Sequence, residues 1–143
     1  MKRVVLNYLV IATITFSATL MSCDKSDYKD PQNLIGRWAH PMYADNAEGK
    51  AIIFYERTNK LPVDSNGIEF IKNGSLIERK NAGWCGTPPV TYSNYSGNWH
   101  TQNENIIITV DYWGGMEHRI WKIIDVTETT LKIEVILQEY DNK

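Results

Sequence analysis

Cysteine is scarce in this chain of 143 residues, which has only Cys23 and Cys85. Basic charge is not in excess either, because 15 lysine and arginine residues stand against 17 aspartate and glutamate residues without a basic cluster. Nucleic acid, which proteins bind through basic patches, is therefore not an expected partner. The three histidines, His40, His100 and His118, lack an H-x-H or H-E-x-x-H spacing. We accordingly predict no metal site and no cofactor.

Long apolar runs are also absent except at the start, where Val4 to Leu20 follows the basic residues Lys2 and Arg3. A basic head, an apolar stretch and small residues before a break are typical of a secretory signal peptide. A spanning helix needs about 20 strongly apolar residues, so this run is too short and too poor to cross a membrane. The run ends in the sequence L-M-S-C, which closes at Cys23.

The L-M-S-C ending resembles the lipobox of bacterial lipoproteins. The resemblance implies that residues 1–22 are a cleaved lipoprotein signal peptide. It also implies that Cys23 carries a thioether-linked diacylglycerol and usually a further acyl chain such as palmitate on its amino group. Each buried methylene contributes about 0.8 kcal/mol, so two or three chains on one residue hold a protein firmly at a membrane. The alternative is an ordinary signal peptide followed by a chance cysteine.

Residues 23–33 follow as a polar, charged stretch, which we expect to be a flexible tether behind the lipidated cysteine. The predicted location is the cell envelope of a Gram-negative bacterium, where the lipid anchor makes the membrane a partner. We favour the outer membrane over the inner one. Asp24 does not by itself decide the leaflet, because acidic residues near this position accompany retention in some bacteria and export in others.

Turn signals divide residues 34–143 into short segments. Asn73-Gly74 is the strongest, because Asn-Gly suits the positive φ angles of a tight hairpin. Six further connections are expected around residues 46–49, 57–67, 83–89, 103–105, 114–115 and 127–129. The segments between them are rich in β-branched and aromatic residues, and Leu131, Ile133, Val135 and Leu137 alternate with residues of the opposite face. We therefore predict an all-β domain, an eight-stranded antiparallel up-and-down barrel, which has no open edges.

The segment L-I-G-R-W, which ends at Trp38, resembles the G-x-W signature that opens the first strand of lipocalins and related calycin barrels. The resemblance falls on Gly36 and Trp38. It implies a short helical turn before the strand and a tryptophan that closes one end of the barrel. In that family an arginine from a late strand crosses the tryptophan, and Arg119 is the best candidate here. We therefore predict that Trp38 and Arg119 close a lipocalin-like barrel of residues 34–143.

Aromatic residues are plentiful on the later strands, and an eight-stranded barrel leaves room for one small ligand or is filled by its own side chains. The tentative ligand-binding residues are Trp84, Tyr95, Trp99, Trp113 and Arg119. For Arg119 an anion receptor inside the barrel is the alternative to a structural cation–π contact. His40 shares a strand face with Trp38 and is expected to look inward.

The segment NAGWCGTPP holds Cys85, which has no intramolecular disulfide partner once Cys23 is lipidated. The glycines allow sharp turns and Pro88-Pro89 stiffens the exit. A reactive thiol needs a lowered pKa from a nearby His, Lys or helix N-terminus, and the local sequence offers none. We predict that Cys85 is a packed loop residue. A ligand-contacting loop between Gly83 and Pro89, and a metal or catalytic role, are the alternatives.

Three functions compete. The favoured one is a membrane-tethered lipocalin-like module that binds a small hydrophobic or amphipathic ligand in the envelope. The alternative is a filled barrel that meets another envelope protein as a scaffold, inhibitor or immunity factor. An enzyme comes last, because no carboxylate pair, Ser-His-Asp pattern or metal cluster stands out, and we predict that the protein is not an enzyme. An open pocket lined by Trp and Tyr would favour ligand binding, and a packed interior with an exposed apolar patch would favour a protein partner.

Overall fold

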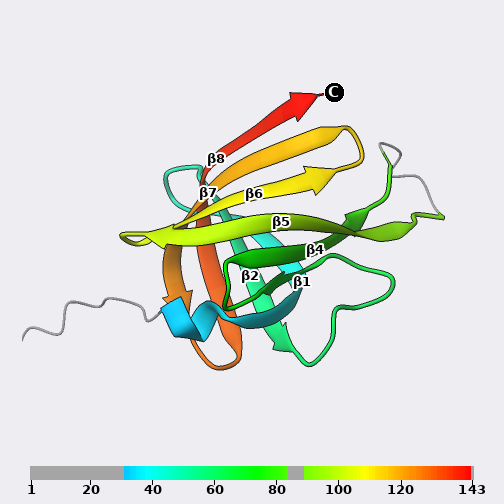
Figure 1. Ribbon diagram of the computed structural model, residues 1–143. Helices are drawn as coiled ribbons and strands as arrows, with labels where there is room; N and C mark the ends of the chain where they lie inside the picture. The colour runs from blue at the N-terminus through cyan, green and yellow to red at the C-terminus, as the bar shows by residue number, and fades with distance from the viewer. Residues whose placement is uncertain (1–30, 84–88, 143) are drawn as a thin grey trace, which may run out of the picture.

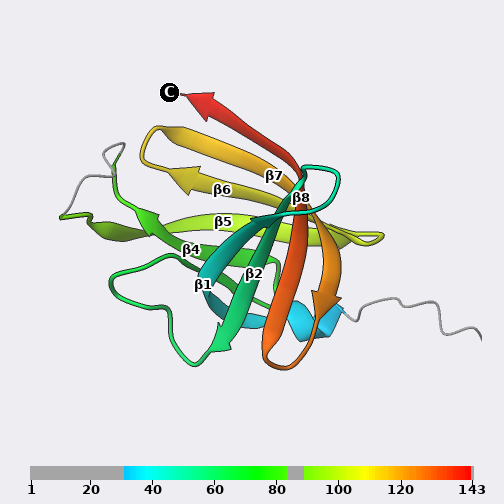
Figure 2. The same ribbon diagram turned by 180° about the vertical axis from the view of Figure 1, so that it is seen from behind.

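The computed structural model describes residues 31–83 and 89–142, which form an all-β domain of eight antiparallel strands closed into a barrel (Figures 1 and 2). The prediction of an eight-stranded antiparallel barrel is thereby confirmed. The strands are β1 (Gly36–Asp45), β2 (Ala51–Thr58), β3 (Gly67–Phe70), β4 (Ser75–Asn81), β5 (Tyr92–Gln102), β6 (Asn105–Tyr112), β7 (Gly115–Val126) and β8 (Thr130–Asn142). A 3-10 helix, Pro31–Leu34, precedes β1 and crosses the expected boundary between tether and domain. Within the described ranges, no helix is long and apolar enough to span a membrane.

The order of the strands around the barrel is β1-β2-β8-β7-β6-β5-β4-β3. Strands β3 to β8 follow one another as a meander, but β1 lies between β2 and β3, and β2 closes the barrel against β8. This strand order differs from that of a strict up-and-down barrel at the connection between β2 and β3, which are not neighbours. Residues 59–66 lead from the end of β2 across β1 to β3, and Arg37 donates a hydrogen bond to the Asn59 carbonyl at 3.1 Å. Two-residue turns join antiparallel strands that are neighbours in the sheet. A connection of eight residues is long enough to pass over an intervening strand.

The tight turns form where the sequence predicts them. At Asn73-Gly74 the glycine has a φ of 85°, and the Asn73 side-chain oxygen accepts a hydrogen bond from the Ser75 amide at 2.9 Å. In the β1–β2 turn the Asn46 side-chain oxygen accepts hydrogen bonds from the amides of Glu48 and Lys50, both at 2.9 Å. These side chains satisfy backbone donors that the strand ladders leave unpaired, which is why asparagine suits the first position of the β1–β2 turn and the third position of the Ile71–Gly74 turn.

The apolar core fills one end of the barrel, the end at which the 3-10 helix and the start of β1 lie (Figure 1). Fully buried members with large side chains are Leu34, Trp38, Ile68, Phe70, Leu76, Ile106, Ile108, Val110, Trp121, Leu131 and Ile133. Phe70 meets Trp99 edge to face, with ring centroids 5.1 Å apart. The indole nitrogen of Trp99 donates to the Ile71 carbonyl at 3.0 Å. This end of the barrel is therefore solid.

Three register shifts interrupt the strand ladders of the described residues, and two of them decide where predicted site residues point. The register shifts between Ala39 and Met42, where His40 has a φ of 53°. His40 is exposed there, so the expectation that it looks inward is wrong, because the bulge breaks the alternation that starts at Trp38. On β8 the extra residue is Ile136, since Val135 pairs with Trp121 and Leu137 with Ile120. The expected alternation therefore holds as far as Val135 and reverses beyond it.

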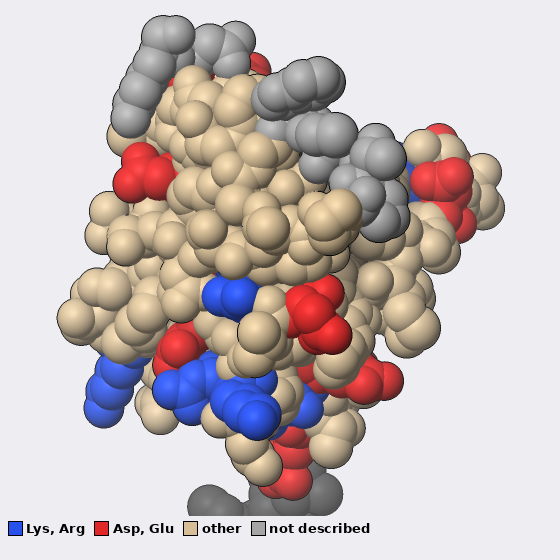
Figure 3. Space-filling model, turned by 90° about the vertical axis from the view of Figure 1, so that its right-hand side faces the viewer, with Lys and Arg blue, Asp and Glu red and all other residues tan. Residues whose placement is uncertain are grey.

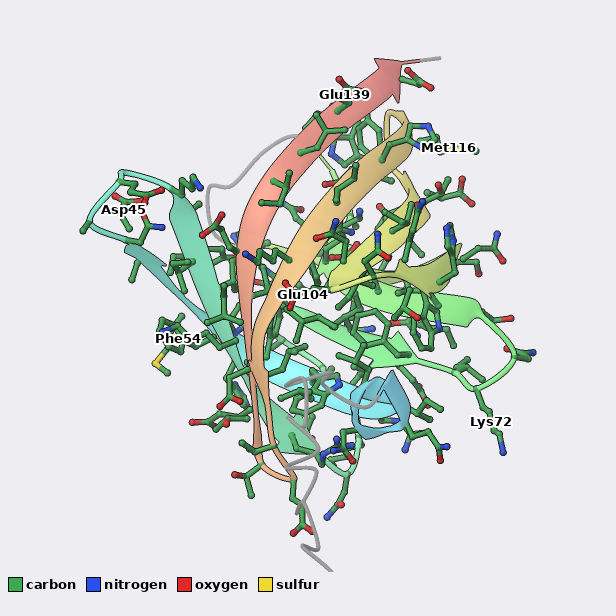
Figure 4. All side chains as sticks on the ribbon, turned by 90° about the vertical axis from the view of Figure 1, so that its left-hand side faces the viewer. Asp45, Phe54, Lys72, Glu104, Met116 and Glu139 are labelled. Atoms are coloured by element: carbon green, nitrogen blue, oxygen red, sulfur yellow. The ribbon has the colours of Figure 1, made fainter. Side chains whose placement is uncertain are left out.

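The charged surface is mixed rather than of one sign. Figure 3 shows Lys and Arg interspersed with Asp and Glu on the lower part of one face, with mostly uncharged surface and a few acidic side chains above them. Figure 4 shows that Met116, near the start of β7, and Glu139, near the end of β8, lie at the same end of the barrel. That end, opposite the solid core, is called the open end below.

Candidate functional site

A cavity of about 200 Å³ lies at the open end of the barrel. Its wall comes from six strands and the connection before β3, and consists of Tyr43, Ile53, Tyr55, Asn66, Gly67, Glu78, Lys80, Glu117, Arg119, Trp121, Gln138 and Tyr140. Strands β4 and β7 place their charged residues on the inner face because Leu76 and Trp121, two residues away, are core side chains. The buried indole nitrogen of Trp121 has no hydrogen-bond partner among the described residues.

Four of these side chains form a closed ring of ion pairs inside the barrel. Arg119 binds the Glu78 carboxylate with both terminal guanidinium nitrogens and lies 3.3 Å from Glu117 through its Nε. Lys80 Nζ lies 3.0 Å from the Glu78 carboxylate and 2.7 Å from that of Glu117. Each cation therefore contacts both anions. Gln138 adds a hydrogen bond, which its amide donates to Glu117 at 2.7 Å.

Three members of the ring, Glu78, Glu117 and Arg119, are each less than a tenth exposed. Burial raises the pKa of the Glu78 carboxyl, but the charges of Arg119 and Lys80 outweigh it and hold that pKa below its ordinary value. Burial lowers the pKa of Arg119, and the neighbouring Glu78 more than reverses this effect. Burial, helped by the charge of Glu78, also raises the pKa of the Tyr55 hydroxyl, which is therefore a neutral hydroxyl.

A second cavity of about 210 Å³ adjoins the first at the mouth. The two share Asn66, Lys80, Glu117 and Tyr140, and the outer one is completed by Asn81, Tyr112 and Trp113. Tyr112 meets Trp113 and Tyr140 edge to face, with centroids 5.6 Å and 5.3 Å away. Trp113 is 52% exposed and Tyr140 51% exposed. The mouth thus presents aromatic rings to solvent beside a charged interior.

The opposite end is closed by Trp38, which is fully buried and donates from its indole nitrogen to the Leu34 carbonyl at 2.8 Å. The cation over its ring is Arg57, whose guanidinium carbon lies 4.1 Å from the ring centroid. The expectation that Arg119 crosses Trp38 is therefore wrong. Arg57 stands directly opposite Trp38 in the β1–β2 ladder, whereas Arg119 stacks on Trp121 at 4.9 Å nearer the open end.

The other tentative ligand residues are divided between the mouth and the core. Trp113 lines the outer cavity, but Trp99 is buried in the core and lines neither of these two cavities. Tyr95 is partly buried against the core, and Lys80 Nζ lies 5.6 Å from its ring centroid. Trp84 and Cys85 lie outside the described residues, so the expectations for both stay predictions.

Several residues of the site were missed by reasoning from the sequence. Glu117 shares the inner face with Arg119 and Trp121 by simple alternation, so this signal was present. Glu78 and Lys80 follow Leu76 at the same spacing. Charged residues on an alternating strand are normally assigned to the solvent side, and nothing in the local sequence says that two such strands face each other across a barrel.

No group of three or more His, Cys, Asp and Glu side chains suited to a metal ion occurs among the described residues. The interior carboxylates are instead neutralised by Lys80 and Arg119. Comparisons with protein-family models, with curated proteins and with solved structures give no match to this chain. The cavities, the ion pairs and the aromatic mouth are therefore the features that point to a function.

Proposed function

We propose that this chain is a lipid-anchored protein of the bacterial cell envelope whose lipocalin-like barrel binds a small amphipathic ligand. The observation that carries the proposal is the cavity of about 200 Å³ at the open end, with its continuation at the mouth. The lipid anchor at Cys23 is proposed from the L-M-S-C sequence and the apolar run before it.

Ligand binding accounts for the contrast between the two ends of the barrel. One end is packed solid around Trp38, whereas the other keeps an opening bordered by a charged ring. Ligand sites are concave, and a few placed polar groups give them their selectivity. A purely apolar ligand would place hydrocarbon against the charged groups of Glu117 and Arg119, which are buried in the cavity wall. An amphipathic ligand suits this lining better than a hydrophobic one.

The protein-partner alternative draws support from exposed apolar side chains around the mouth. Tyr43, Trp113 and Tyr140 are each at least half exposed, and they surround the same opening. A partner protein that inserted a side chain there would use the cavity as well. Experiments on the mouth must therefore separate a small molecule from a protein.

Native mass spectrometry of the full-length chain, purified from its own membrane, tests the proposal. We expect a bound small molecule that dissociates on collisional activation. Asn66→Trp should abolish its retention, because exposed Asn66 borders both cavities and a large ring there would block the mouth. Asn59→Trp, in the same connection but outside both cavities, is the matched control. A protein retained in place of a small molecule, or no ligand in any form, would refute the proposal.

A further inference from the structure

We propose that the ligand is a neutral saccharide, whose terminal ring enters the charged cavity while the next ring lies on the aromatic mouth. This inference rests on the proposed function and names the chemical class of the ligand. Three features carry it: the balanced charge of the interior, the exposed aromatic rings and the division of the site into two adjoining cavities.

The charged ring favours a ligand without net charge. Glu78 and Glu117 are opposed by Lys80 and Arg119, and each cation contacts both anions, so the interior is already neutral. A charged ligand would bring an unbalanced charge into a poorly solvated space or would have to break an existing pair, and both are costly. Hydroxyl groups avoid this cost, because they donate to carboxylate lone pairs that the ion pairs leave unused and change no charge.

The remaining polar groups of the cavity suit hydroxyls as well. Asn66 and Gln138 carry amides, which can both donate and accept, and Tyr55 contributes a neutral hydroxyl from a buried ring. A ligand with many hydroxyls around its rim, such as a pyranose ring, matches this mixture of donors and acceptors. A fatty acid or sterol offers a single polar group and would leave most of the wall facing hydrocarbon.

The aromatic mouth supplies the other half of carbohydrate chemistry. A sugar ring has hydroxyls at its rim and apolar C–H groups on its faces, and these faces stack on aromatic side chains. Trp113 and Tyr140 are about half exposed, and Tyr112 supports both by edge-to-face contacts. Supported rings lose little conformational freedom when a ligand stacks on them. A cationic ligand is not favoured here, because Lys80 already places its ammonium 5.9 Å from the centroid of the Tyr112 ring.

The size and division of the site fit a chain of sugar rings. Drug-sized ligands occupy roughly 300–1,000 Å³, so each of these cavities suits one compact ring. The inner cavity measures about 200 Å³ and the outer one about 210 Å³. Because they share Asn66, Lys80, Glu117 and Tyr140, a disaccharide or the end of an oligosaccharide would fill both without a gap.

Isothermal titration of the full-length protein, held in phosphatidylcholine nanodiscs to avoid sugar detergents, tests the inference. The neutral probes are maltose, cellobiose, lactose, mannobiose and xylobiose, and the charged probes are digalacturonate and the chitosan dimer. We expect at least one neutral disaccharide to bind and the charged dimers to bind less well. Its affinity should change little from low to high salt, because no charge pairs with the ligand. Native mass spectrometry of the same sample reports any other bound small molecule.

Variants of the mouth locate the binding. Trp113→Ala should weaken binding about tenfold or more, and Trp113→Tyr should restore most of it, because the ring rather than the indole is needed. Phe54→Ala is the matched control. Phe54 (labelled in Figure 4) lines neither cavity and stands on the opposite face of β2 from the inward Ile53 and Tyr55. The ammonium of Lys132 lies 5.0 Å from the centroid of its ring. Binding of charged dimers only, or binding indifferent to Trp113→Ala, would overturn the inference.

The remaining outcomes separate this inference from the proposed function. If no disaccharide binds but a different small molecule is retained and Asn66→Trp abolishes its retention, the assignment of the ligand as a saccharide is wrong. The proposed binding function then stands. If no disaccharide binds and nothing is retained, both are wrong.

Discussion

Removing Glu78 from the charged ring should destabilise the barrel by a predictable amount. Glu78 is 8% exposed and pairs with both Arg119 and Lys80, so Glu78→Met leaves an excess of positive charge in the interior. Breaking a buried ion pair by removing one partner costs about 3–5 kcal/mol. Because Glu117 still contacts both cations, we expect the lower end, about 3 kcal/mol. That is a large share of the roughly 5–15 kcal/mol by which a domain is stable.

A double variant separates the charge imbalance from lost packing. In Glu78→Met/Arg119→Met the pair of Lys80 and Glu117, 2.7 Å apart, stays closed and the interior stays neutral. Replacing both members of a buried pair by apolar residues is often neutral or stabilising, so the double variant should be more stable than Glu78→Met alone. Urea unfolding followed by tryptophan fluorescence measures the free energy of unfolding of the unchanged chain, of Glu78→Met, of Arg119→Met and of the double variant. Together these four values form a double-mutant cycle.

The pH dependence of the free energy of unfolding tests the same ion pairs independently. The pKa of Glu78 is lowered in the folded barrel, so its contribution is complete above the ordinary value of 4.5 and is lost as the pH falls through the folded value. The difference in unfolding free energy between the native chain and Glu78→Met should therefore shrink below about pH 4.5. A cost at neutral pH below about 1 kcal/mol, or a double variant as unstable as the sum of its singles, would refute this account.

Three further predictions concern the closed end of the barrel, the close approach at Gly97 and the lipid anchor. Trp38→Ala should cost about 3–5 kcal/mol in urea unfolding, because this buried ring closes the barrel, whereas Trp113→Ala at the exposed mouth should cost far less. Gly97→Ala should cost about 1–3 kcal/mol, since a β-carbon there would lie 2.8 Å from Val110 Cα. Gly83→Ala should be nearly neutral, because no described residue lies within 4 Å of a β-carbon added there, and equal midpoints of the two variants would contradict this. Cys23→Ser should abolish incorporation of labelled fatty acid and release the chain from the membrane fraction, and persistent lipidation would disprove the anchor.

The bulge on β8 shows why part of the site escaped prediction. Leu131 and Ile133 face the core as their alternation predicts, but the extra residue at Ile136 turns Gln138 and Tyr140 into the cavity. Nothing in the local sequence marks that insertion, because isoleucine is an ordinary strand residue.

The sequence by itself determined the local features of this protein. The β-branched segments and the Asn73-Gly74 turn follow from backbone preferences and alternation, which act over a few residues, and the buried Trp38 was expected from the resemblance of Gly36 and Trp38 to the G-x-W signature. Tertiary structure alone decided which strands are neighbours and which charges meet. Glu78 and Arg119 are 41 residues apart, and only closure of the barrel brings them together. Arg57 rather than Arg119 crosses Trp38 for the same reason, because long-range pairing depends on the whole sheet.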